Sequence, residues 1–192
     1  MKEQYILKTK RALKEIQQKD EYACFGKKTV TIEERLRNPF KQKLYLYFKL
    51  LRKYEYFCFK RDTCNNLLLS KLFSFQIKTC DCIKNRIGLK IGVEIKPFSC
   101  EASTRICHPN VIINGYVGEN CIFHGNNVIG NKKSGEKTAV PNIGNNVDIG
   151  IGAMIIGNVE LADNCVVGAG AVVTKSFKTP GTTIAGVPAR EI

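Results

Sequence analysis

The chain has 192 residues, enough for one modest domain with an extension, and its 44% hydrophobic share can supply a buried core. It contains no run of about eighteen apolar residues, so the sequence predicts no membrane-spanning helix. The nine cysteines form no CxxC pair. We therefore expect no zinc site and, with no signal peptide and an odd cysteine count, a reducing cytoplasmic location.

The formal net charge of +13 belongs entirely to the N-terminal half of the chain. Residues 1–90 hold 22 Lys and Arg against 9 Asp and Glu, whereas residues 91–192 hold 8 of each kind. A basic surface attracts anionic partners such as a membrane, a phosphorylated carrier or nucleic acid. A solvated basic face is the simpler interpretation. We expect no nucleic-acid partner, because the sequence has no recognisable motif for one.

Helical periodicity fills the N-terminal part of the chain, and we predict that residues 1–85 form an α-helical region. Apolar side chains recur there at helical spacing, and Gly or Pro interrupts the pattern where loops are expected. The predicted helices cover residues 1–19, a short stretch from Thr31, about 40–59 and about 63–77, with a loop over 20–30 and strand structure from Ile87.

The helix predicted over residues 40–59 interleaves aromatic residues with Lys and Arg. Asn38 is a candidate N-cap, and Pro39 fits the first helical position. One interpretation is an interfacial helix that gives the basic region a peripheral contact with the inner face of a membrane. The alternative is packing against neighbouring helices, which amphipathic patterns more often indicate.

A repeat of six residues dominates the second half of the chain. Neither a helix nor a strand has this period, whereas a short regular repeat is typical of a solenoid with stacked coils. Three six-residue segments make a triangular coil of about 18 residues, with neighbouring coils about 4.8 Å apart. We predict such a mainly β solenoid over residues 86–180, followed by a tail at 181–192. The apolar anchors are Val117, Phe123, Ile129, Ile143, Ile149, Ile155, Leu161, Val167 and Val173.

Corners and one loop are also visible in the repeat. Asn and Gly suit tight corners, where positive φ angles are often needed. The spacing from Ile129 to Ile143 is fourteen instead of twelve, and the intervening segment is polar. We therefore predict a loop that projects from the solenoid. The asparagines expected at corners are Asn120, Asn145, Asn146, Asn158 and Asn164.

The repeat and the chain ending together resemble hexapeptide-repeat acyltransferases. The segment NIGNNVDIGIGAMIIGNVELADNCVVGAGAVVTK, followed by AGVPAREI, is similar to the ends of serine O-acetyltransferases and of polysaccharide and sugar O-acetyltransferases. The helical extension looks like that of capsule-locus members. Over about residues 86–192 the resemblance implies a left-handed parallel β-helix, a homotrimer, acetyl-CoA as co-substrate and no metal.

Histidine is the natural base for this chemistry, and the chain has two, His108 and His124. Transfer of an acetyl group to a hydroxyl needs a base near neutral pH. His108, two residues after an apolar anchor, matches the family's general base. Glu94, in EIKP, matches the carboxylate that orients this histidine in the family. The spacing from Glu94 to His108 is one residue shorter than in the family, and Glu101 is the alternative acid. His124 is a second candidate base or an acceptor-site residue.

The resemblance also implies where acetyl-CoA binds. Its pantetheine arm would follow backbone at solenoid corners, and positive side chains would approach its phosphates. The implied residues are Ala153 and Ala169 for pantetheine, Thr174, Lys175 and Arg190 for the phosphates, and Lys132 and Lys133 in the loop as further phosphate contacts.

The acceptor is predicted from one departure from the family pattern. Serine acetyltransferases carry a second His before the Pro of the loop, whereas Ala139 and Val140 precede Pro141 here. An amino-acid carboxylate would lose its cationic partner, so we predict a sugar hydroxyl of a surface polysaccharide or its precursor as acceptor. Serine O-acetyltransferase is the alternative. A non-catalytic β-helix scaffold whose basic region binds polyanions is the alternative of another class.

Overall fold

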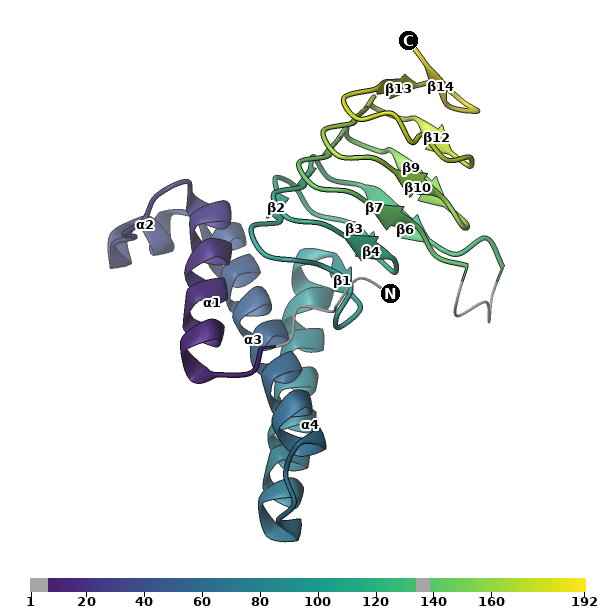
Figure 1. The fold of residues 1–192 in the computed structure, drawn as a ribbon. Coiled ribbons are helices and arrows are strands. Elements are labelled where there is room, and N and C mark those ends of the chain that lie inside the picture. Colours follow the sequence, from purple (N-terminus) through teal and green to yellow (C-terminus); the bar gives the residue numbers. More distant parts are fainter. Residues whose placement is uncertain (1–6, 134–138) are drawn as a thin grey trace. The chain divides into compact units, whose positions relative to one another are not determined.

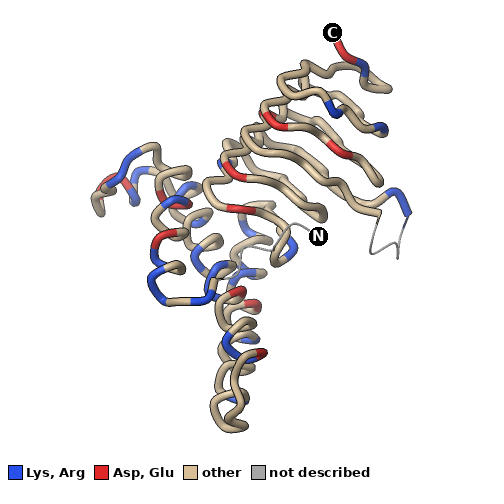
Figure 2. The backbone as a smooth tube through the Cα atoms, viewed as in Figure 1, with Lys and Arg blue, Asp and Glu red and all other residues tan. Residues whose placement is uncertain are grey.

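The computed structural model describes residues 7–133 and 139–192 (Figure 1). The chain divides into two compact units, Met1–Ile91 and Gly92–Ile192. The first unit is helical, and the second is a stack of short, mostly parallel strands. Lys and Arg are dense in the helical unit and sparse in the strand unit, as the sequence predicts (Figure 2).

The helical unit consists of four helices whose ends have clear local causes. Thr9 caps the first by accepting a hydrogen bond from the Ala12 N–H, and Thr31 forms a capping box with Glu34 at the second. Helices α3 and α4 pack along each other as a hairpin, and α1 and α2 pack on α3. The helices are α1 (Lys10–Phe25), α2 (Ile32–Arg37), α3 (Pro39–Asp62) and α4 (Leu67–Ile91).

Two of the predicted helix ends are wrong, and glycine explains both. Helix α1 continues into the predicted loop and ends at Phe25. Gly26 caps it in the left-handed conformation, with a φ of 73°. Helix α4 continues through the predicted strand start at Ile87 and stops before Gly92, at φ 66°. The domain boundary predicted after residue 85 therefore falls inside α4. Residues 1–6 of the first predicted helix lie outside the described residues.

The start of α4 is also displaced from its predicted place, because Asn66 supplies the cap. Its side-chain oxygen accepts hydrogen bonds from the Leu68 and Leu69 N–H groups at 2.9 and 3.1 Å. Asn38 stands before α3 as predicted, but its side chain makes no capping hydrogen bond there.

Aromatic residues of α3 form the core of the helical unit. Tyr45, Tyr47, Phe48 and Tyr56 are all buried. This burial favours the packing interpretation of the aromatic helix over an interfacial one. None of the described helices is both long enough and apolar enough to cross a membrane.

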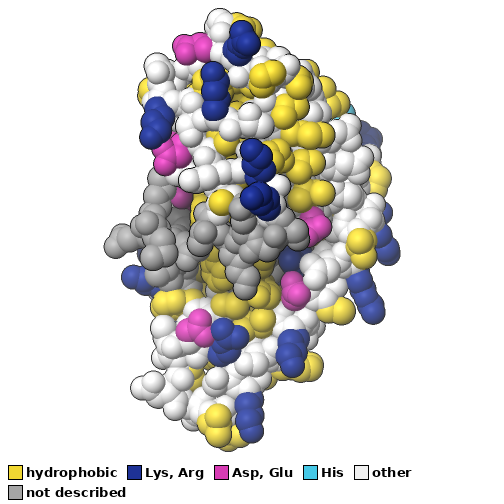
Figure 3. Space-filling view, turned by 90° about the vertical axis from the view of Figure 1, so that its right-hand side faces the viewer, with side chains coloured by type: hydrophobic (Ala, Val, Ile, Leu, Met, Phe, Trp, Pro, Cys, Tyr) yellow, Lys and Arg dark blue, Asp and Glu magenta, His cyan; other side chains and the backbone are white. Residues whose placement is uncertain are grey.

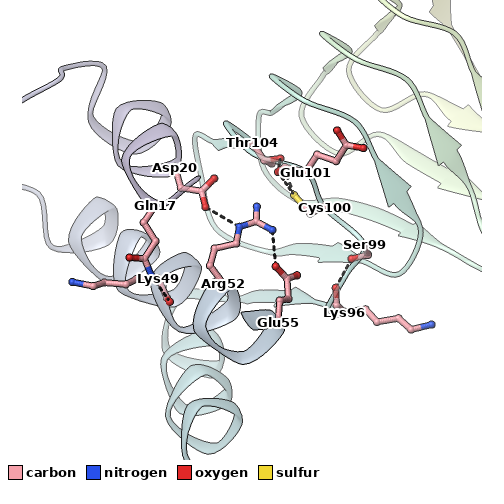
Figure 4. Close-up of polar contacts among 10 residues, drawn as sticks. All are labelled: Gln17, Asp20, Lys49, Arg52, Glu55, Lys96, Ser99, Cys100, Glu101 and Thr104. Carbon is pink, nitrogen blue, oxygen red and sulfur yellow. Dashed lines mark hydrogen bonds and ion pairs between the residues drawn. The ribbon is translucent and has the colours of Figure 1, made fainter. Parts of the chain in front are cut away.

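A charged cluster from α1 and α3 is also buried in the helical unit (Figure 4). The Arg52 guanidinium donates to Asp20 at 2.9 Å and to Glu55 at 3.1 Å, and the three side chains are 1–6% exposed. Buried charges are tolerated only when paired and hydrogen-bonded, so this cluster makes the stability of the unit depend on all three partners.

The strand unit is a parallel β-helix with three faces. One face is a five-stranded sheet, another has three strands, and the third has six. The five-stranded face consists of β1 (Val93–Ile95), β3 (Val111–Ile113), β6 (Asn127–Gly130), β9 (Met154–Ile156) and β12 (Val172–Val173). The three-stranded face consists of β4 (Tyr116–Val117), β7 (Asn142–Ile143) and β10 (Glu160–Leu161). The six-stranded face consists of β2 (Arg105–Ile106), β5 (Ile122–Phe123), β8 (Asp148–Ile149), β11 (Val166–Val167), β13 (Thr183–Ala185) and β14 (Arg190–Glu191).

The predicted anchors fill the interior of the coils. Phe123 stacks on Ile149, which in turn stacks on Val167, and all three are at most 1% exposed. Asn127 and Thr104 are polar residues that are also fully buried. Asn127 shows how such a residue is satisfied. Its side chain receives the Gly125 N–H and donates to the carbonyl of Gly150, so its burial leaves no unpaired group.

One corner of the β-helix is a ladder of asparagines. The Asn120 side chain donates to Asn146 at 3.3 Å, and Asn146 donates to Asn164 at 3.2 Å. All three adopt positive φ angles near 55–61°, a conformation that Asn tolerates well. Asn145 and Asn158, which were also predicted to need positive φ, do not have it.

The loop before β7 is longer than the sequence spacing suggests. Ladder partners are 18 residues apart in a regular coil but 26 apart across this loop. Ile129 and Ile143 lie on consecutive faces, which one six-residue repeat would connect in a regular coil. The loop therefore adds eight residues to the coil, and not the two that were predicted from a regular spacing of twelve. The tail also contributes structure, because Thr183–Ala185 continues the parallel six-stranded face before β14 turns back antiparallel.

Candidate functional site

Both histidines lie on the same corner of the β-helix, in adjacent coils. Strands β2 and β5 pair in register, Arg105 with Ile122 and Ile106 with Phe123. His124 therefore stands one coil beyond Cys107, and the residue above His108 is Gly125. The His108 side chain is exposed, whereas His124 is half-buried.

His108 packs closely against the next coil, and its neighbour there, Gly125, has to be glycine. A Cβ atom on Gly125 would lie 2.7 Å from the His108 Cβ, closer than real contacts allow, and Gly125 has a φ of 113°. Only glycine adopts this conformation without strain. Gly125 was not among the predicted site residues, although the repeat sets its place one position after His124.

Gly125→Ala should therefore damage the site as well as the fold. We expect a loss of stability of roughly 1–3 kcal/mol from the strained backbone. Displacement of His108 by about 1 Å would lower the turnover number by roughly 100-fold. Thermal unfolding and steady-state kinetics measure the two effects.

Gly130→Ala is the matched control, because a Cβ there meets no atom within 4 Å and its φ is not positive. Equal behaviour of the two variants would contradict the role of Gly125.

His124 has a carboxylate partner in the following coil. Its Nε2 atom lies 2.8 Å from the Asp148 Oδ1 atom, and both side chains are a little under half exposed. A carboxylate at this distance fixes the orientation of an imidazole ring. Asp148, which directly precedes an interior anchor, was not among the predicted site residues.

The predicted acids are placed differently. Glu94 is exposed in the middle of β1, opposite Ile112 of β3, and Glu101 is half-buried between β1 and β2. Within the described residues neither carboxylate pairs with His108, and the histidine that contacts a carboxylate there is His124, with Asp148. The orienting role of Glu94 thus stays a prediction.

The predicted acetyl-CoA residues differ in how accessible they are. Ala153 is fully buried, and its N–H already donates to the Gly150 carbonyl at 3.2 Å, so it offers pantetheine little. Ala169 is exposed at a corner. The phosphate candidates Thr174, Lys175, Arg190, Lys132 and Lys133 are all exposed.

The end of the chain is held by a backbone hydrogen bond to the last coil. The Ala189 N–H donates to the Val172 carbonyl at 2.9 Å, which holds the residue before Arg190 against the coil that continues to Thr174 and Lys175. The Lys175 ammonium lies 5.4 Å from the centre of the Phe177 ring, a cation–π contact that leaves it exposed. This end of the β-helix can therefore present several cations to an anionic group.

The interior cysteines are unsuited to act as nucleophiles. Burial raises the pKa of Cys121 to about 12 and also raises the pKa of Cys165. A thiol attacks as its thiolate, which these residues do not form near neutral pH. Within the described ranges no cluster of three His, Cys, Asp or Glu side chains is placed to hold a metal ion.

Comparison with known proteins assigns the repeat. Residues 141–175 match a family model described as bacterial transferase hexapeptide (six repeats). The match lies within the strand unit, whose six-residue repeat it describes. The left-handed β-helix predicted from the resemblance, with an α-helical N-terminal region, is confirmed by solved structures of the same architecture.

The solved structures resemble almost the entire chain. The soybean serine acetyltransferase apoenzyme superposes with a TM-score of 0.69 over 94% of this chain and 69% of that chain, at 22% identity. The Neisseria gonorrhoeae serine acetyltransferase gives a TM-score of 0.68 over 95% of this chain and 68% of that one, at 19% identity. At such identities the likeness concerns the fold alone.

Curated relatives match shorter stretches. The serine acetyltransferase of Buchnera aphidicola subsp. Schizaphis graminum is 36% identical over 115 residues, 57% of this chain and 44% of that protein. The galactoside O-acetyltransferase of Escherichia coli K12 is 47% identical over 62 residues, 32% of this chain and 30% of that protein. The hexapeptide-repeat chain thus spans less than half the length of these relatives.

These comparisons correct the predicted acceptor. The prediction of a sugar hydroxyl of a surface polysaccharide is wrong, because the relatives that match longer stretches of this chain than the galactoside enzyme does are serine acetyltransferases. The likeness to capsule-locus enzymes likewise finds no support. Ala139 and Val140 do not decide the acceptor alone, because a carboxylate can also be held by cations from other coils.

Proposed function

We propose that this protein is an acetyl-CoA-dependent serine O-acetyltransferase. The observation that carries the proposal is the joint likeness of sequence and fold to serine acetyltransferases, together with an exposed histidine on a β-helix corner. The reaction transfers an acetyl group from the thioester of acetyl-CoA to the hydroxyl of L-serine.

His108 is the general base in this proposal. Its imidazole removes the hydroxyl proton as the oxygen attacks the thioester carbonyl, and it then protonates the departing CoA thiolate. Exposure of the side chain leaves it accessible to an acceptor. The raised pKa values of Cys121 and Cys165 argue against a covalent acetyl intermediate on either of these two interior thiols.

The site is completed by other residues and by other copies of the chain. We assign the acetyl-CoA phosphates to Lys175, Arg190 and Thr174, which are exposed near the end of the β-helix. Outward residues of the five-stranded face, Ile112 and Met154, are each 42% exposed and apolar. They fit contact with a neighbouring subunit in a homotrimer, whose grooves would hold the co-substrate.

The amino-acid carboxylate needs a cation that Ala139 and Val140 cannot supply. Arg105 is exposed at the start of β2, three residues before His108, and is the group that we assign to this role. Its guanidinium can bind a carboxylate through two parallel hydrogen bonds.

A panel of acceptors tests the proposal. The purified chain is incubated with acetyl-CoA and, separately, with L-serine, L-homoserine and a galactoside, and released CoA thiol is measured. We expect the highest kcat/KM with L-serine. Turnover of the galactoside but not of L-serine would overturn the proposed acceptor while leaving acetyl-CoA chemistry in place.

Asp148→Asn tests which histidine carries the chemistry. Because the carboxylate contacts His124 and not His108, we expect the turnover number to fall less than about tenfold, with a larger effect on the KM for the acceptor. Steady-state kinetics with varied L-serine separate these effects. A fall in the turnover number as large as that caused by removing His108 would transfer the role of base to His124.

A further inference from the structure

The tip of the α3–α4 hairpin carries an exposed apolar surface that no part of the described chain covers. In Figure 1 this hairpin extends past the end of α1, within the helical unit. Five side chains at the start of α4 are 46–77% exposed, a concentration that is rare on a solvated helix. These residues, which we name the hairpin tip, are Leu67, Leu68, Leu69, Leu72 and Phe75.

The hairpin tip begins a regularly spaced stripe of exposed residues along one side of α4, which is apolar up to Phe75 and mixed further along. The opposite side of the helix packs on α3, where Phe73 stacks on Phe57 and Ile77 is buried. Exposed positions recur at alternating intervals of four and three residues, which places them on a single stripe. The stripe consists of Leu68, Leu72, Phe75, Thr79, Cys82, Arg86 and Leu89.

Cations flank this stripe, and the nearby carboxylates are already paired. Lys71 and Lys78 are exposed beside the hairpin tip. Asp62 is paired with Arg61 at 2.8 Å, and Asp81 is paired with Lys84 at 3.2 Å. An apolar helix face with basic flanks complements an anionic lipid surface, which accepts the apolar side chains and attracts the cations.

Charge also distinguishes this occupant from a second copy of the chain. Two copies packed stripe to stripe would bring the Lys71 and Lys78 side chains of both together, with no unpaired carboxylate on the described hairpin to offset them.

Figure 3 shows hydrophobic side chains beside Lys and Arg at the lower end of the molecule, where the hairpin ends. We propose that the hairpin tip docks on membranes that contain anionic phospholipid.

Phe75→Trp provides a direct reporter, because the chain contains no tryptophan. The full chain is titrated with vesicles of phosphatidylcholine alone and of phosphatidylcholine with phosphatidylglycerol, at low salt. We expect a blue shift of the emission, and co-sedimentation, with the anionic vesicles only. Lys71→Gln with Lys78→Gln should weaken binding about 25-fold, because each cation near the surface contributes about fivefold.

Leu68→Ser with Leu72→Ser should abolish binding without unfolding the exposed helix. The matched control is Ile32→Ser with Leu36→Ser, since these side chains are 79% and 77% exposed on α2 but stand beside Glu33 and Glu34. No binding to anionic vesicles, or equal effects of the two pairs, would overturn the proposal. A blue shift that depends on protein concentration without vesicles would overturn it in favour of a second copy.

Discussion

Replacing His108 with alanine should lower the turnover number by roughly 100- to 10,000-fold, the usual contribution of a positioned acid–base group. The KM for acetyl-CoA should change little, because the proposed phosphate contacts lie at the other end of the β-helix, near Lys175 and Arg190. The imidazole acts on the acceptor proton and contributes to chemistry more than to binding. Steady-state kinetics with varied acetyl-CoA and L-serine measure both quantities.

His124→Ala is the informative companion, since His124 is on the same corner, one coil further along. We expect it to retain most of the turnover number. The assignment of the base would be contradicted if the His108 variant kept normal turnover while the His124 variant lost it. Thermal unfolding of both variants shows whether a loss of activity reflects unfolding.

Replacing Arg52 with alanine should have the largest effect on stability. The change leaves the Asp20 and Glu55 carboxylates buried without the cation that now contacts both. Removing one partner of a buried ion pair typically costs about 3–5 kcal/mol. Urea unfolding of the full chain, followed by the helical circular dichroism signal, measures the change in the free energy of unfolding.

Lys43→Ala is the matched control for this prediction, because Lys43 is an exposed cation on the same helix. Its effect should lie within about 0.5 kcal/mol. A loss below about 1 kcal/mol for the Arg52 variant would show that the carboxylates find other partners or water. The cluster would then not be what ties α1 to α3.

The six-residue repeat made the β-helix predictable, because its period matches neither a helix nor a strand. Anchors such as Phe123 and Ile149 occupy the interior as expected, since each is apolar and each recurs at the same place in its coil. The helical unit was harder to predict in detail. Its helices end where Gly26 and Gly92 adopt positive φ angles, and hydrophobic periodicity does not report where those angles occur.

The site was predicted only in part, for a physical reason. The spacing of residues places His108 and His124 on the same corner, but the partner of His124, Asp148, comes from a coil beyond the long loop. That loop adds eight residues between strands, so the spacing along the chain hides the contact. The acceptor was predicted wrongly because one missing histidine says little about cations supplied by other coils.

Acetyl-CoA binding tests the central claim most directly. Acetyl-CoA is titrated by calorimetry into the purified full chain, whose oligomeric state is measured in the same buffer. We expect saturable binding with a Kd within roughly 1 μM–1 mM, the usual range for an enzyme's substrate, and weaker binding after Lys175→Ala with Arg190→Ala. The absence of any binding by a folded oligomer at millimolar acetyl-CoA would contradict the transferase function and favour a non-catalytic scaffold.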